Sequence, residues 1–370
     1  MNLAEILVFT DIKQLHQIAG YYRCECNLNS KNDLITTLLV NLRHRQTIRT
    51  ELERLTEVEK HFLLLLFLDK RSLFTLEDLL AKAGIALDCS EEKTEEKARK
   101  YVALALTRGW LFPAKGKTVG QFQVPRDIRE PYLSAWLEQQ ELRRLQEAPA
   151  VYRDEGTALC DDIYQFLRFL AQEPVPLTSD GGMYKRYQTQ LLRFLSVEEK
   201  PVAGEKWRFG YGLHFDLYPD RFSLLYDFCF YQRWIEEGKM QVELTDRGQE
   251  MLAQPYTDKT YHELIRFWIR LYKRAIPNLP MLVQLIPLMA GSEWVAHAEI
   301  EQSLLKWLKP FYYDDPASIL SNRLLKMMVH LGLLKAGQAE GGEWYYSTTY
   351  ACQTWLKEYN GFTETTILLK

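Results

Sequence analysis

The sequence feature that most constrains the fold is a repeated change from helical to strand periodicity. Over most of the chain apolar residues recur at spacings of three and four, as in helices, and strong strand patterns are scarce. At three places a helical pattern ends at a glycine and an apolar strand pattern follows at once. These places are Arg108-Gly109-Trp110-Leu111, Glu237-Gly238-Lys239-Met240 and Leu331-Gly332-Leu333-Leu334. Because glycine readily ends helices and the spacing is unequal, the sequence predicts three related modules rather than a tight solenoid.

The first of these modules shows the order of its elements. Its predicted elements are a buried helix around Phe62–Leu68, a helix from Thr75 that stops at Gly84, a helix over Thr94–Arg108, and a hairpin of Trp110–Pro113 and Gln121–Val124. Three helices followed by a hairpin is the order of a winged-helix domain. We therefore predict a mainly α fold of tandem winged-helix domains with short β-hairpin wings.

The chain of 370 residues is too long for one ordinary core, since domains average ~150 residues. We expect four modules: a small helical module at 1–50, a first winged helix with a connector helix at 51–150, a second winged helix at 151–257 and a third at 258–370. The connector is predicted as one helix from Asp127 to Glu147. Ala148-Pro149-Ala150 then marks the boundary.

The second and third winged helices have their own patterns. In the second, one helix is expected to turn Tyr184, Tyr187, Leu191 and Leu195 toward the core, and Phe222–Glu236 is expected to form the next helix, ending at Gly238. Alternation over Met240–Leu244 indicates a strand. The expected elements of the third are helices over Tyr261–Arg274, Met281–Met289, Ala298–Leu308 and Ser318–Leu331, then a hairpin of Leu333–Ala336 and Trp344–Ser347.

Composition limits the classes of protein. Lys plus Arg number 46 against 49 for Asp plus Glu, a net charge of −3, which excludes a histone-like polycation but leaves room for local basic faces. The longest purely apolar run, Phe62–Leu68, is far short of the ~20 residues that span a bilayer, and no secretory signal is visible. The six cysteines match no redox or zinc motif. We expect a soluble cytoplasmic protein that does not contact membranes.

The most informative charge pattern lies on the third helix of the first winged helix. Lys97, Lys100 and Arg108 fall within an arc of about 80° on that helix. Lys115 and Lys117 occupy the tip of the hairpin that follows. A basic helix with a basic wing would neutralise DNA phosphates. The alternative is a solvated face whose charges are offset by the acidic loop over residues 91–96.

A second motif carries a family resemblance. The segment Pro174-Val175-Pro176-Leu177-Thr178-Ser179-Asp180-Gly181-Gly182-Met183-Tyr184-Lys185-Arg186, followed by Leu244-Thr245-Asp246-Arg247-Gly248, resembles the winged-helix region attached to XPB-type helicases. The resemblance covers about residues 159–252. No G-x-x-x-x-G-K-[ST] phosphate loop is present, so it implies the accessory region without the helicase motor. Separately, residues 15–39 are similar to SAP or Rho N-terminal modules.

Two further helical faces carry cations. Arg186, Gln190 and Arg193 share one face of the helix that starts in the XPB-like motif, and with Lys185 they form a second candidate DNA contact. Arg and Gln read guanine and adenine edges, but they are also ordinary surface residues. In the third winged helix, Asn322, Arg323, Lys326 and His330 fall within about 100°. Because Glu340 and Glu343 in its hairpin would repel phosphates, we assign that face to protein contact rather than DNA.

Enzyme signatures are weak. Pro219-Asp220 and Glu237-Gly238-Lys239 spell a PD…E-x-K nuclease pattern, but a helix over 222–236 would hold its two ends ~22 Å apart, too far to share Mg²⁺. The seven histidines show no metal-ligand spacing, and no cofactor motif is present. The aromatic runs Phe228–Tyr231 and Phe311–Tyr313 could stack bases, but neither has basic residues interleaved, so we predict that both pack in cores.

These observations favour a non-enzymatic protein that binds double-stranded DNA through the cations of its first two winged helices. The third winged helix would then dock another protein or a second copy. The alternative is an interaction scaffold, an adaptor for a helicase or transcription protein without direct DNA binding. A metal nuclease using Asp220 is a third hypothesis, and it predicts Mg²⁺-dependent cleavage.

Overall fold

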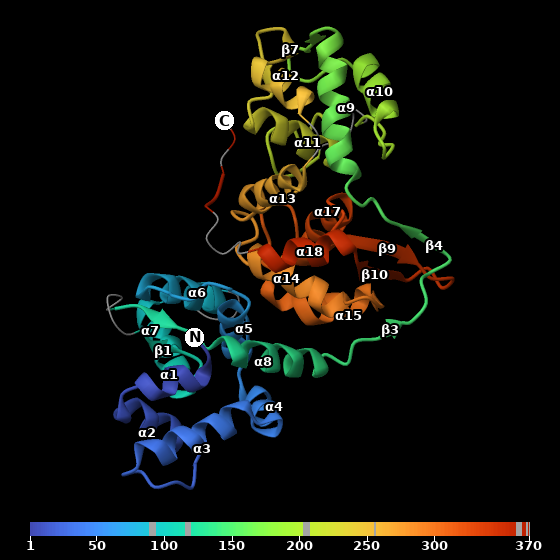
Figure 1. Cartoon of the computed structure of the whole chain (residues 1–370). Coiled ribbons are helices and arrows are strands. Elements are labelled where there is room, and N and C mark those ends of the chain that lie inside the picture. Colours follow the sequence, from blue (N-terminus) through green and yellow to red (C-terminus); the bar gives the residue numbers. More distant parts are fainter. Residues whose placement is uncertain are drawn as a thin grey trace. The chain divides into compact units, whose positions relative to one another are not determined.

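The computed structural model describes residues 1–88, 94–114, 120–202, 208–254, 257–359, 365–367 and 369. It is mainly helical, at 57% helix, with small antiparallel sheets, which confirms the predicted mainly α class. Contacts between residues divide the chain into two compact units, Met1–Leu142 and Arg143–Lys370, whose elements are labelled in Figure 1. The finer division into four modules stays a prediction.

The first unit begins with four short helices. These are α1 (Leu3–Phe9), α2 (Ile12–Tyr21), α3 (Lys31–Arg43) and α4 (Arg45–Arg54). Ser30 caps α3, because its hydroxyl accepts a hydrogen bond from the Asp33 N–H at 3.3 Å. The apolar faces of α2 and α3 pack together through Leu15, Ile18 and Leu38, which are fully buried.

The rest of the first unit follows the order expected from the sequence. Its elements are α5 (Glu57–Phe67), α6 (Leu76–Asp88), α7 (Glu95–Thr107), β1 (Phe112–Pro113), β2 (Phe122–Gln123) and α8 (Arg126–Glu138). The apolar run Phe62–Leu68, most of which lies in α5, is buried throughout, as predicted. The predicted stop at Gly84 is wrong: α6 continues through it, because Ala86 and Leu87 extend the buried apolar face for another turn.

The second unit starts with two short strands and a compact helical group. Its first elements are β3 (Arg144–Leu145), β4 (Val151–Arg153), α9 (Ala158–Gln172), β5 (Val175–Pro176), α10 (Lys185–Phe194), α11 (Asp220–Tyr231), β6 (Ile235–Glu237), β7 (Gln241–Leu244) and α12 (Asp246–Ala253). The helix expected over 222–236 ends at Tyr231, and the following residues form β6. The sheet order is β5-β7-β6.

The second unit then continues through another helical group. Its elements are α13 (Asp258–Tyr272), α14 (Leu279–Ala290), β8 (Trp294–Ala296), α15 (His297–Leu304), the 3₁₀ turn η1 (Leu305–Trp307), α16 (Pro316–Ser318), the π-helix η2 (Ile319–Leu325), α17 (Lys326–His330), β9 (Leu334–Gln338), β10 (Trp344–Thr348) and α18 (Tyr350–Glu358). The predicted hairpin is confirmed as β9 and β10, whereas strand β8 was missed.

The predicted connector helix over Asp127–Glu147 is wrong at its end. Helix α8 stops at Glu138, and the chain then contributes β3 and β4 to the two edges of a five-stranded sheet, in the order β3-β8-β10-β9-β4. Residues Arg144–Leu145 pair with β8, and Val151–Arg153 pair with β9. The segment around Pro149 therefore belongs to the second unit rather than to a linker.

One arrangement of elements occurs three times. Helix, strand, helix, helix, strand, strand describes α9 to β7 and again α14 to β10, and in both the first strand pairs with the last, which pairs with the middle one. In the first unit the place of the first strand is taken by Phe74, whose N–H and carbonyl each bond Phe122 of β2 at 2.8 Å. The winged-helix arrangement of each copy stays a prediction.

The ends of the three helices before the hairpins are also alike. Gly109 and Gly332, with φ of +69° and +65°, end α7 and α17 as predicted. Gly238 does not end a helix; it lies in the β6–β7 turn, and Arg233 with φ of +58° follows α11 instead. In all three copies the residue after the left-handed one bonds five residues back, as Trp110 does to Ala105 at 3.0 Å.

Candidate nucleic-acid interface

Arg108 was predicted to belong to a basic ridge formed by Lys97, Lys100, Arg108, Lys115 and Lys117. In the structure Arg108 does not lie on an exposed face. Only 7% of this residue is exposed. Its guanidinium pairs with the carboxylates of Glu59 at 2.7 Å and Glu51 at 3.0 Å, and it donates to the Tyr21 hydroxyl at 3.1 Å. Arg108 therefore cannot reach a phosphate, and it joins α7 to helices α2, α4 and α5 instead.

The two acids around Arg108 respond differently to burial. Burial raises the pKa of Glu51, and the bonds from Tyr21 and Arg108 only partly oppose it. Burial also opposes ionisation of Glu59, but the Thr56 N–H and the Arg108 guanidinium outweigh it, so the pKa of Glu59 lies below its ordinary value. The site is a structural ion cluster rather than an anion-binding one.

The remaining cations of the ridge are exposed to different degrees. Lys100 is exposed and Lys97 is half-buried. Arg99 beside them pairs with Glu95 at 2.7 Å, so the open face of α7 carries both signs of charge. Lys115 and Lys117 lie outside the described residues. Of the five cations of the predicted basic ridge, the described part of the chain therefore leaves two, Lys97 and Lys100, on an accessible face.

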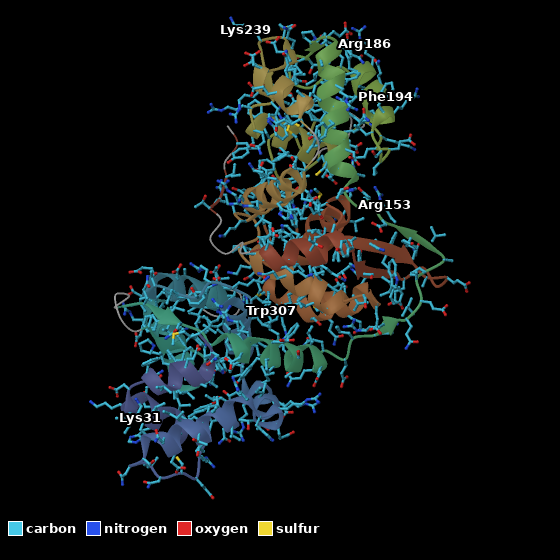
Figure 2. All side chains as sticks on the ribbon, in the orientation of Figure 1. Lys31, Arg153, Arg186, Phe194, Lys239 and Trp307 are labelled. Atoms are coloured by element: carbon cyan, nitrogen blue, oxygen red, sulfur yellow. The ribbon has the colours of Figure 1, made fainter. Side chains whose placement is uncertain are left out.

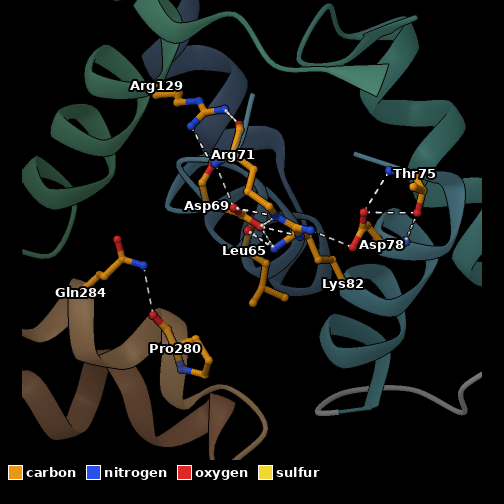
Figure 3. Close-up of polar contacts among 9 residues, drawn as sticks. All are labelled: Leu65, Asp69, Arg71, Thr75, Asp78, Lys82, Arg129, Pro280 and Gln284. Atoms are coloured by element: carbon orange, nitrogen blue, oxygen red, sulfur yellow. Dashed lines mark hydrogen bonds and ion pairs between the residues drawn. The ribbon is translucent and has the colours of Figure 1, made fainter. Parts of the chain in front are cut away.

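Arg129 on α8 is a further cation of the first unit, and it also makes contacts that stabilise the fold. It donates to the carbonyl oxygens of Asp69 at 2.6 Å and Arg71 at 2.9 Å (Figure 3). The Asp69 carboxylate is fully buried and pairs with Arg71 and with Lys82, both at 2.8 Å. Burial lowers the pKa of Lys82 to about 8, although Asp69 opposes the shift. This cluster holds the α5–α6 corner together.

Helix α10 of the second unit presents the clearest basic surface in the described chain. Leu191 and Leu192 are buried on its inner face, and Gln188 donates to the Met183 carbonyl at 2.7 Å. The opposite face is exposed and carries all four predicted DNA contacts. They are Lys185, Arg186, Gln190 and Arg193. These four positions fall within an arc of about 140°, so they can face one ligand together.

Aromatic side chains flank these cations. The Arg186 guanidinium lies 4.6 Å from the Tyr187 ring centroid and donates to its hydroxyl at 3.1 Å, which orients it. Tyr184 was predicted to face the core, but it is 45% exposed because it precedes the first turn of α10. Phe194 at the other end of α10 is also exposed.

The β6–β7 hairpin ends beside the start of α10. Leu177 donates to the Met240 carbonyl at 2.8 Å and also bridges Met183, just before the helix. Lys239 and Met240 at the hairpin end are both exposed. We call the following set the α10–hairpin surface: Tyr184, Lys185, Arg186, Gln190, Arg193, Phe194, Lys239 and Met240. Figure 2 labels Arg186, Phe194 and Lys239.

The basic face predicted on the third winged helix is only partly open, because Asn322 and Lys326 are exposed whereas the other two residues are not. Arg323 and His330 are buried, and Lys326 pairs with Asp220 of α11 at 2.6 Å. His330 pairs with the buried Glu155 at 3.0 Å. The predicted contact of this face with another protein stays a prediction, because the contact that the structure shows, between Lys326 and Asp220, lies within the same chain.

Helix α11, the third helix of its copy, is buried as well. Arg221 is fully buried between Glu155 at 3.0 Å and Asp162 at 2.5 Å. Asp220 at its start binds Lys326 of α17, so α11 and α17 contact each other through charges. In both copies within the second unit, therefore, the third helix is used for internal packing.

The nuclease pattern has a different structure from the one the sequence indicated. Glu237 lies on strand β6 rather than at a helix end, so the argument from a helix of ~22 Å is wrong. Asp220 pairs with Arg208, Lys326 and Arg323, whereas Glu237 binds His214 at 3.1 Å and accepts from Tyr226 at 2.7 Å. The two carboxylates thus occupy separate clusters, each with its own cations.

The two aromatic runs behave differently from each other. Phe228 and Cys229 are fully buried, as predicted for core packing. Tyr312 and Tyr313 are 74% and 71% exposed, so the prediction that their run packs in a core is wrong. They occupy a tight turn, which leaves both rings outside. The one sequence signal for the exposure of Tyr312 and Tyr313 was that their run lacks the apolar periodicity of a helix.

Comparisons with known proteins leave the family open: no family model matches the chain, and no curated protein is similar to it in sequence. Across the described residues, no helix is both long enough and apolar enough to cross a membrane. In the same part of the chain, no group of three or more His, Cys, Asp or Glu side chains is arranged to hold a metal ion.

Proposed function

We propose that this protein is a non-enzymatic, double-stranded DNA-binding protein that contacts the phosphate backbone through the α10–hairpin surface. The observation that carries the proposal is the exposed face of α10, which carries Lys185, Arg186 and Arg193. The exposed Lys239 lies on the hairpin whose Met240 carbonyl accepts from Leu177, which in turn bridges Met183 just before α10. Cations grouped on one exposed helix and an adjacent hairpin are what a duplex backbone attracts. Gln190 on the same face can bond base edges.

The repeated element order supports a winged-helix interpretation of each copy and agrees with the resemblance to the accessory region of XPB-type helicases. In this interpretation α10 is the second helix of its domain, and α11, the third, is withdrawn into the unit. Lys97 and Lys100 on α7 would add weaker contacts, because Arg99 and Glu95 on the same face form their own pair.

Duplex binding should therefore depend on salt and on α10. Four cations on the α10–hairpin surface predict a log–log salt slope of about −4, and each cation lost should reduce it by ~1. The experiment is fluorescence anisotropy of a labelled duplex with the full chain and with Arg186→Glu/Arg193→Glu. The matched control is Lys357→Glu, an exposed lysine on α18 of the same unit. Equal loss of affinity in the control and the double variant would contradict the proposal.

A second candidate function is an adaptor for a helicase or transcription protein. It is favoured by one observation: both third helices of the second unit are buried in contacts within the chain, which is unusual if they evolved to read a major groove. An adaptor would retain an ATPase partner in a pull-down and would show no salt-dependent affinity for duplex DNA. The same anisotropy titration separates the two functions.

A further inference from the structure

A tight turn on the second unit holds two tyrosines in solvent. Phe311 and Asp314 bond each other through both backbone pairs, at 2.9 and 3.0 Å, so Tyr312 and Tyr313 are the two central residues. Tyr312 has φ of +51°, a left-handed conformation that glycine or asparagine ordinarily takes at such a position. A strained aromatic residue whose ring is not buried gains little for the fold, and such residues cluster at functional sites.

Hydrogen bonds from Arg323 hold the turn against neighbouring elements of the second unit. The Asp314 carboxylate accepts from Arg323 at 2.8 and 3.3 Å, and Arg323 also donates to the Phe209 carbonyl at 2.5 Å. Arg323 belongs to the π-helix η2. π-Helices are rare in proteins, and those that occur are often found at functional sites. The Arg323 guanidinium further lies 5.0 Å from the centroid of the buried Tyr211 ring. The two exposed rings therefore stand on a fixed base rather than on a loose loop.

The rings belong to a larger aromatic group. The Phe209 ring centroid lies 5.9 Å from that of Tyr312 and 5.4 Å from that of Tyr313. Phe215 and Phe311 complete the group, at 5.9 and 6.4 Å from Phe209. Phe209, Phe215 and Phe311 are half-buried, whereas the two tyrosines are exposed. The aromatic group therefore extends from the protein interior to the solvent. Successive bases stack on such a series of rings in proteins that bind single strands.

The charges around the turn suit a nucleic acid held mainly by stacking. Three cations, Arg208, Arg323 and Lys326, share the carboxylates of Asp220 and Asp314, which leaves one positive charge in excess. Lys309 and Lys326 are exposed, although Lys326 pairs with Asp220 at 2.6 Å, and the exposed Asp216 and Asp315 limit the net charge. In the described part of this region the exposed large apolar side chains are the two tyrosines. A protein-binding hot spot would ordinarily be surrounded by further apolar contacts.

We infer that the turn over Phe311–Asp314 is a binding site for unpaired nucleobases of single-stranded DNA or RNA, which stack on Tyr312 and Tyr313. This inference goes beyond the proposed duplex contact and uses different residues. It predicts a shallow dependence of affinity on salt, because stacking and not phosphate neutralisation supplies most of the affinity.

The test is anisotropy of a fluorescein-labelled oligothymidylate of about 12 nucleotides with the full chain, in parallel with the duplex. Tyr312→Gly/Tyr313→Ser should weaken oligothymidylate binding by about 5- to 150-fold for each stacked base lost, and should leave duplex binding unchanged. Tyr312→Gly relieves the left-handed residue, so the variant keeps the turn. The matched control is Tyr350→Ala, an 83% exposed tyrosine on α18 that should have no effect.

Several outcomes overturn the inference. They are no oligothymidylate binding by the unmodified chain, equal binding by the double variant, or a loss as large in Tyr350→Ala. Retention by Tyr312→Phe/Tyr313→Phe supports stacking, because the rings remain. If the double variant instead loses only a protein partner, the turn is a protein-binding site and the inference is wrong. Loss of duplex binding in Arg186→Glu/Arg193→Glu alone concerns the proposed function and leaves this site standing.

Discussion

Arg108 offers the sharpest test of the distinction between a DNA contact and an internal ion cluster. In Arg108→Ala the carboxylates of Glu51 and Glu59, both buried, lose their common cation. Removing one partner of a buried pair costs about 3–5 kcal/mol, since an uncompensated charge remains in the interior. Two charge-assisted hydrogen bonds at ~1.5–3 kcal/mol each lead to the same range. The first unit should therefore lose about 3–5 kcal/mol of unfolding free energy.

The assay is urea unfolding of the full chain followed by hydrogen exchange of peptides from α5 and α7, because the two units can unfold separately. The matched control is Arg99→Ala on the same helix, an exposed cation paired with Glu95 four residues earlier. Such exposed pairs contribute about 0.3–0.5 kcal/mol. The control should thus leave the transition of the first unit almost unchanged.

The pH dependence of Arg108→Ala provides a second check. Without the guanidinium, burial should raise the pKa of Glu51 further, and Glu59 keeps only the Thr56 bonds to lower its pKa, so both carboxyls should take up protons at a higher pH than in the unmodified chain. The loss of stability should therefore be largest near pH 7 and smaller near pH 5. Replacing Glu51 with Gln in the same background should recover part of it. If Arg108→Ala unfolds like Arg99→Ala but weakens duplex binding, the assignment of Arg108 to the fold is wrong.

Two further predictions concern the second unit. His214 lies between Asp227 and Glu237; burial opposes its charge, but the two carboxylates outweigh it and raise its pKa from 6.5 to about 9. Since the folded-state pKa is the higher one, the stabilisation is complete below pH 6.5 and is lost as the pH rises through 9, by about 3 kcal/mol. Urea midpoints at pH 6 and 9.5 should differ less for His214→Gln than for the unmodified chain, and equal differences would count against it. In Gly332→Ala the new Cβ would lie 1.7 Å from the Gly156 carbonyl oxygen at a φ of +65°, so thermal unfolding should show a loss above ~1–2 kcal/mol. Gly341→Ala, where nothing lies within 4 Å, should be neutral, and an equal loss in both would show that the close approach is unimportant.

Local patterns in the sequence were enough to predict most helices of the fold. Periodicity located α7 and α13 to within a few residues, because one face of each is apolar. The errors occurred where two rules competed. Gly84 is a helix breaker by type, yet the buried Ala86 and Leu87 carry α6 past it.

The middle copy of the repeat shows a different limit of local patterns. Its left-handed residue is Arg233 and not glycine, so the sequence pointed to Gly238, five residues too late. The same 6→1 hydrogen bond from Trp234 to Cys229 at 3.0 Å ends the helix nonetheless. A non-glycine residue takes this conformation because the tertiary packing of Trp234 and Ile235 requires the turn there.

The functional surface was harder to predict, because a basic helical face and one half of an internal ion pair look the same in a sequence. Arg108 and Glu59 are 49 residues apart, Lys326 and Asp220 are 106 apart, and His330 and Glu155 are 175 apart. Only the fold brings each acid to its cation. Arg193 and Lys185 on α10 remain exposed because the inner side of α10 is occupied by Leu191 and Gln188. The α10–hairpin surface therefore keeps its exposed cations on folding, and duplex affinity should follow these cations rather than the total number of cations in the sequence.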